Sequence, residues 1–94
     1  MNATKVVFRK WKSNGGIIAL FPEEASDQSG LYCMSYEHVG QHGAASPDLS
    51  HCTEPASERE YAELKRELEH IGYVLDVKSR ITQTMHNKRR MQLR

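Results

Sequence analysis

Residues 57–77 read SEREYAELKRELEHIGYVLDV, and this stretch predicts a helix that passes through one glycine into a strand. Ser57 and Glu60 form a capping-box pattern, in which each side chain accepts a hydrogen bond from the backbone amide of the other. Gly72 supplies the residue of positive φ at which such a helix ends. Beyond Gly72 apolar and polar residues alternate, which is the pattern of a strand.

The predicted helix is amphipathic. Its apolar side chains recur at helical spacing and share one face: Tyr61, Leu64, Leu68 and Ile71. Burial of aliphatic side chains of this size contributes about 1.5–3 kcal/mol each. Because a helix of this length is marginal alone in water, we expect its apolar face to pack against a sheet.

Three further strands are predicted before the helix. Lys5–Trp11 and Ile17–Phe21 flank the dipeptide Asn14-Gly15, which is the strongest short signal for a hairpin. Leu31–Glu37 alternates again and predicts a third strand. The order β-β-β-α-β predicts an α+β fold, with a three- to four-stranded, mostly antiparallel sheet and one helix packed on one face. The other face would be left for solvent, a partner or a ligand.

The 94 residues predict one small domain over residues 1–81, followed by a basic, flexible tail over 82–94. Residues 38–56 are predicted to be an ordered loop, although a loop of that length is unusual in a compact domain. No apolar run approaches the ~20 residues that cross a bilayer, and the basic N-terminus lacks a signal-peptide core. We therefore expect no membrane contact, a cytoplasmic location and reduced Cys33 and Cys52.

The net charge of +1 conceals an uneven distribution, because all 12 acidic residues lie between Glu23 and Asp76. Basic residues from both ends, with one tryptophan, are candidate nucleic-acid contacts: Arg9, Lys10, Trp11, Arg80, Lys88, Arg89 and Arg90. Nucleic-acid-binding domains usually carry a larger basic surplus. The competing interpretation is therefore a solvated tail.

Histidines and cysteines gather in the middle of the chain: Cys33, His38, His42, His51 and Cys52. His38 and His42 could share a metal ion on a helix, and thiolates would complete a zinc site. The spacing lacks paired Cys-x-x-Cys half-sites, however. A thiolate nucleophile with a histidine base is the enzymatic alternative. The favoured interpretation is that these side chains brace the loop through hydrogen bonds, so no metal, cofactor or catalytic residue is predicted.

Three phrases together resemble a family of small uncharacterised bacterial proteins carried by mobile elements or phages: IIALFPEE (17–24), YCMSYEHVGQHG (32–43) and EYAELKRELEHIGY (60–73). The resemblance covers residues 4–80 and implies no activity, substrate or cofactor. It supports a bacterial cytoplasmic setting. It also directs attention to a candidate binding loop, with Tyr36, His38, Gln41 and His42.

The sequence thus predicts a small non-enzymatic binding module that self-associates or binds a protein partner. A nucleic-acid-binding accessory protein that uses its basic termini is the alternative. A small metal- or cysteine-dependent enzyme is the third interpretation.

Overall fold

The computed structural model describes residues 3–25, 33–37, 41–45 and 52–91. Within these ranges the chain forms six strands and two helices: β1 (Thr4–Trp11), β2 (Ile17–Ala25), β3 (Cys33–Glu37), β4 (Gln41–Ala45), β5 (Thr53–Pro55), α1 (Glu58–Ile71), β6 (Leu75–Lys78) and α2 (Gln83–Met91). The strands form one mostly antiparallel sheet, which confirms the predicted α+β class.

The sheet has the order β4-β3-β2-β1-β5, and β6 pairs with β1 as well. The predicted hairpin joins β1 to β2, with Gly15 at φ 74° and its amide donating to the Trp11 carbonyl at 2.8 Å. The sheet contains more strands than predicted, because β4 and β5 form within the segment 38–56 that was expected to lack regular structure. Both are short and carry no apolar alternation, so only their backbone pairing with β3 and β1 defines them.

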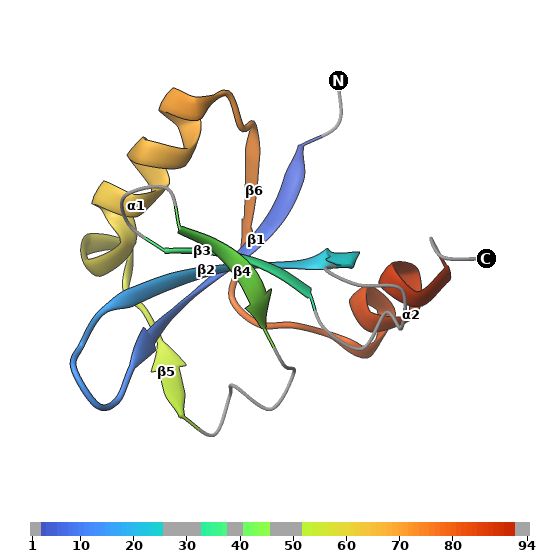
Figure 1. Cartoon of the computed structure of the whole chain (residues 1–94), viewed down its shortest axis with the longest axis horizontal. Helices are drawn as coiled ribbons and strands as arrows, with labels where there is room; N and C mark the ends of the chain where they lie inside the picture. Colours follow the sequence, from blue (N-terminus) through green and yellow to red (C-terminus); the bar gives the residue numbers. More distant parts are fainter. Residues whose placement is uncertain (1–2, 26–32, 38–40, 46–51, 92–94) are drawn as a thin grey trace.

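The edge of β1 opposite β2 is shared by two strands. β5 runs antiparallel to residues 9–11 of β1, whereas β6 runs parallel to residues 4–7. Figure 1 shows β5 beside one end of β1 and β6 beside the other. The two strands therefore separate at Phe8, whose carbonyl accepts a hydrogen bond from the Ala56 amide at 3.3 Å.

The first face of the sheet packs against α1. Its core contains seven buried side chains: Val6, Phe8, Ala19, Phe21, Tyr36, Leu64 and Leu68. The capping box is confirmed, since Ser57 Oγ accepts from the Glu60 amide and Glu60 Oε1 accepts from the Ser57 amide. The predicted burial of Ile71 is wrong, because its side chain is 55% exposed. Ile71 is the last residue of α1, and the chain turns back at Gly72 (φ 124°) before the sheet can cover it.

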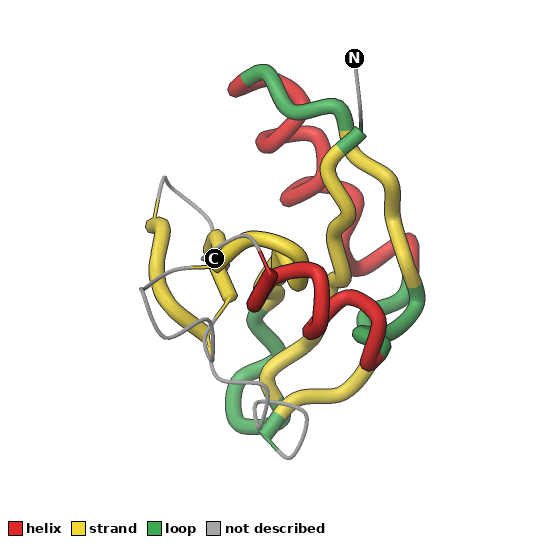
Figure 2. The backbone as a smooth tube through the Cα atoms, turned by 90° about the vertical axis from the view of Figure 1, so that its right-hand side faces the viewer, coloured by secondary structure: helices red, strands yellow, loops and turns green. Residues whose placement is uncertain are grey.

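The second face of the sheet is also covered, so the prediction of an open face is wrong. Ile18, Leu20 and Cys33 form a second buried cluster, and α2 packs on β2 with Met85 buried. In Figure 1 the strands lie between α1 and α2, and Figure 2 shows α2 on the side nearer the viewer. The segment predicted as a flexible tail thus contains a packed helix.

α2 was not predicted because one of the side chains that it buries is an arginine. Arg89 is 2% exposed, and its Nη1 donates to the carbonyl of Pro22 at 2.6 Å. Met85 and Arg89 stand four residues apart and face the same side of the helix. A pattern of apolar residues alone therefore does not reveal the inward face of α2.

We expect Arg89→Ala to destabilise the protein by about 2–3 kcal/mol, because it removes a charge-assisted hydrogen bond and opens a cavity under α2. Arg90→Ala is the matched control, since Arg90 is exposed on the same helix, and surface changes of this kind cost about 0.5 kcal/mol or less. Urea unfolding of the two variants measures the difference. Equal stability of the two variants would contradict the assignment of Arg89 to the core.

Candidate functional site

Five of the seven predicted nucleic-acid contacts make contacts within the fold. Arg9 Nη2 donates to the Thr53 carbonyl at 2.9 Å, and Trp11 Nε1 donates to Glu37 Oε1 at 2.9 Å. Lys10 forms ion pairs with Glu54 and Glu60, and Arg89 is buried. Lys88 is exposed but its Nζ lies 3.8 Å from Glu23 Oε1 in an ion pair. The remaining two, Arg80 and Arg90, are exposed. The basic residues predicted to form one nucleic-acid surface are therefore divided between structural contacts and solvent.

Lys10 links β1 to the first turn of α1. The hydrogen bond from Lys10, together with that from the Ser57 amide, lowers the pKa of Glu60 to about 2. The same contacts with Glu60 and Glu54 raise the pKa of Lys10. Both charges are thus held in their ionised forms at neutral pH by an interaction that joins the sheet to the helix.

The candidate binding loop is only partly described. Tyr36 is 1% exposed and belongs to the core, because Phe8, Ala19 and Tyr36 lie in one cross-strand row beneath α1. Gln41 and His42 lie on β4, where His42 is the backbone partner of Tyr36. His38 falls outside the described residues. Ligand contact by Tyr36 is therefore not supported, and contact by the other three stays a prediction.

The described cysteines do not form a reactive site. Cys33 is buried, and burial raises the pKa of its thiol, which disfavours the thiolate required of a nucleophile. Cys52 is exposed at the entrance to β5. In the described ranges no three His, Cys, Asp or Glu side chains gather as metal ligands, and His38 and His51 lie outside those ranges.

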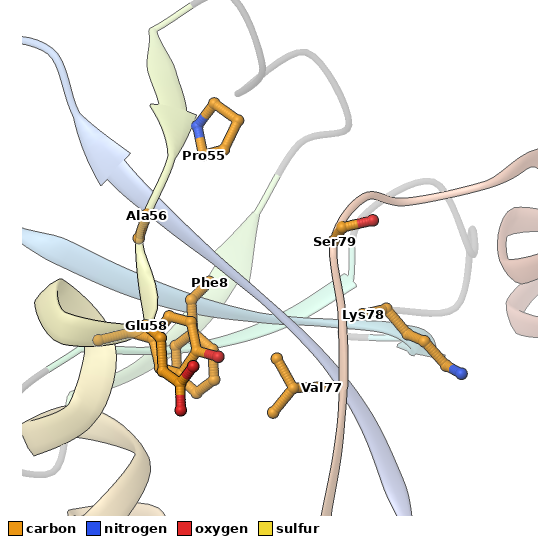
Figure 3. A pocket seen from close by; sticks show the side chains of 8 residues that line it. Phe8, Pro55, Ala56, Glu58, Val77, Lys78 and Ser79 are labelled. Carbon is orange, nitrogen blue, oxygen red and sulfur yellow. The ribbon is translucent and has the colours of Figure 1, made fainter.

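A cavity of about 320 Å³ occupies the fork where β5 and β6 separate. Eight residues line it: Phe8, Pro55, Ala56, Glu58, Tyr61, Val77, Lys78 and Ser79. Phe8 and Tyr61 stack with ring centroids 4.3 Å apart, so both rings are engaged with each other. Figure 3 shows Lys78 pointing away from Glu58 and Phe8. The cavity thus marks the place where α1 stops covering the end of β6.

The backbone of β6 exposes an unpaired edge. The Thr4 amide donates to the Val74 carbonyl at 2.7 Å, and the register pairs Thr4 with Leu75 and Val6 with Val77. In a parallel pair of this register, the backbone amide and carbonyl groups of residues 74, 76 and 78 point toward β1. Those of Leu75 and Val77 therefore point away from β1, and no described strand pairs with them.

Apolar and charged side chains surround this edge. Ile71, the last residue of α1, and Val74, which directly precedes β6, are 55% and 54% exposed. Asp76 and Lys78 lie on one face of β6 and form an ion pair with each other, with Lys78 Nζ 3.4 Å from Asp76 Oδ2; each side chain is 41% exposed. We call Leu75–Lys78 together with Ile71 and Val74 the β6 edge. It combines open hydrogen-bonding groups, exposed apolar surface and one charge of each sign.

Comparison of the chain with protein-family models, curated proteins and solved structures found no match. The resemblance noted in the three sequence phrases therefore stays a prediction. Neither α1 nor α2, the helices in the described part of the chain, is long and apolar enough to span a membrane.

Glu60→Gln tests the structural role assigned to Lys10, because it keeps an acceptor for the Ser57 amide and removes the carboxylate. The folded-state pKa of Glu60, about 2, lies below its usual value of 4.5. The carboxylate therefore stabilises the fold above pH 4.5, and this contribution is lost as the pH falls toward 2. We expect urea unfolding to show that the wild type is more stable than the variant at neutral pH, and that the difference closes over that window.

High salt should also reduce the difference, because the ion pair is exposed to solvent. A difference between wild type and Glu60→Gln that is independent of pH would contradict the role of the Lys10–Glu60 pair.

Proposed function

We propose that this protein is a non-enzymatic interaction module that binds a protein partner by β-strand addition at the β6 edge. The observation that carries the proposal is the outward direction of the Leu75 and Val77 backbone groups, with which no strand in the described ranges pairs. An extended segment of a partner would gain main-chain hydrogen bonds there, as in other complexes formed by strand addition.

The side chains of the β6 edge support the same function. Proteins usually protect edge strands by short length, charged side chains, proline, bulges or covering elements, because an open edge pairs readily with other chains. β6 is short and carries Lys78, but it contains no proline and no bulge in its register with β1. An added strand would also lie beside the exposed Val74, which directly precedes β6, so that apolar burial would add to the backbone hydrogen bonds.

The nucleic-acid alternative has weaker support, because Arg9, Lys10 and Trp11 bind β5, α1 and β3 rather than facing solvent together. The enzymatic interpretation has weaker support because the Cys33 thiol is buried with a raised pKa. A bacterial cytoplasmic setting rests on the sequence resemblance and is part of the proposal.

Val77→Pro removes the outward amide without removing a hydrogen bond to β1, since proline is tolerated where the N–H of an edge strand faces solvent. Val77→Ala is the matched control, because it shortens the same half-buried side chain but keeps the amide. Peptides selected from a displayed random library for binding to the wild type should bind Val77→Pro about tenfold more weakly or worse, and should bind Val77→Ala nearly as well as wild type.

Thermal unfolding would confirm that both variants are folded. Selected peptides that bind Val77→Pro as tightly as the wild type would contradict strand addition at β6. Failure to select any peptide with protein kept dilute enough to be monomeric would do the same.

A further inference from the structure

We propose that the partner at the β6 edge is a second copy of this chain, with the two β6 strands antiparallel about a twofold axis at Val77. This inference rests on the proposed function and adds the identity and register of the added strand. Twofold homodimers are the commonest protein assemblies, and their interfaces are self-complementary. The β6 edge has this self-complementary character in both its backbone and its charges.

The backbone limits the registers that two β6 strands can adopt. In an antiparallel pair, residues that exchange two hydrogen bonds alternate with residues that exchange none. The backbone amide and carbonyl groups of Leu75 and Val77 point away from β1, whereas those of Asp76 and Lys78 point toward β1. With the axis at Val77, the outward groups of Val77 in the two copies meet directly. Two backbone hydrogen bonds form on the axis, and no bond to β1 is broken.

The charges select this register among those that the backbone allows. With the axis at Val77, Asp76 lies opposite Lys78 of the second copy, and Lys78 lies opposite Asp76 of the second copy. Both are non-hydrogen-bonded pairs, in which the Cα atoms approach to about 4.5 Å and the side chains lie close together. Because both side chains are 41% exposed on one face, they are accessible to the second copy.

Other positions of the axis are less favourable. An axis at Asp76 sets two carboxylates opposite each other, and an axis at Lys78 sets two ammonium groups opposite each other; like charges in such pairs are destabilising. An axis at Leu75 sets Asp76 opposite the apolar Val74. Among these registers, only the axis at Val77 places opposite charges at both flanking positions.

Self-association also suits the size and surface of the chain. A domain of 94 residues buries a modest share of its surface on folding, and further burial of apolar side chains is favourable. Ile71 and Val74 are exposed beside the strand that would pair, at 55% and 54%. The dimer would continue the sheet through both copies and leave the cavity at Phe8 beside the axis, because Val77 and Lys78 line that cavity.

Charge variants of the full chain test the register. Asp76→Lys alone and Lys78→Asp alone each place like charges opposite one another at both flanking positions. Each variant should dimerise about tenfold more weakly than the wild type, or worse, by sedimentation equilibrium over a wide range of protein concentration. An equimolar mixture of the two variants should form a heterodimer, because every flanking pair then has opposite charges.

The double variant Asp76→Lys with Lys78→Asp is the matched control, because it keeps the net charge and restores both pairs, so it should dimerise like the wild type. Thermal unfolding of each variant checks that the exchanged charges, which lie beside Lys5 on β1, have not disrupted the sheet. If one single variant does not fold, the other single variant, compared with the double variant, still tests the register.

The outcomes separate the two proposals. A wild type that stays monomeric at every concentration, or variants that all dimerise equally, would overturn the second copy as the partner in this register. If peptides nevertheless bind the wild type but do not bind Val77→Pro, strand addition stands and the partner is another protein. Peptide binding with the same affinity in Val77→Pro as in the wild type would overturn the proposed function itself.

Discussion

The hydrogen-bonding edge of β1 that faces away from β2 is the constraint on which the structure depends. One strand of eight residues has to satisfy that edge with two short partners, one antiparallel and one parallel. Unpaired backbone groups are costly when buried, so both β5 and β6 are required along a strand whose centre is buried. The two partners diverge at Phe8, and that divergence creates the cavity, limits the reach of α1 and leaves β6 at the margin of the sheet.

Several charged residues of the chain connect the elements of this arrangement. Arg9 and Lys10 hold β5 and the first turn of α1 against the antiparallel half of β1, and Arg89 fixes α2 to β2 through the Pro22 carbonyl. A basic residue read from sequence as a contact for phosphate can thus serve as a connection between elements. In the proposed dimer the backbone of β6 would supply the main attraction, and the charges of Asp76 and Lys78 would set the register.

Local patterns in the sequence predicted the parts of the fold that local interactions determine. The capping box at Ser57, the turn at Asn14-Gly15 and the alternation of Val6 and Phe8 each depend on neighbours within a few residues. β4, β5 and α2 depend on distant partners: backbone pairing forms the two strands, and a buried arginine sixty-seven positions from its acceptor fixes the helix. For the same reason, the β6 edge could be recognised only once the register with β1 was known. Tyr36 was predicted to be a contact on the sequence resemblance, and only its cross-strand pairing with Ala19 shows that it lies in the core beneath α1.

Hydrogen exchange at β6, followed residue by residue by NMR in dilute solution where the protein is monomeric, tests the central claim most directly. The account predicts alternation: the amides of Asp76 and Lys78, which point toward β1, exchange slowly, whereas those of Leu75 and Val77 exchange quickly because they face solvent. Slow exchange at Leu75 and Val77 in the monomer, equal to that of their neighbours, would show that the edge is already paired and would contradict the account.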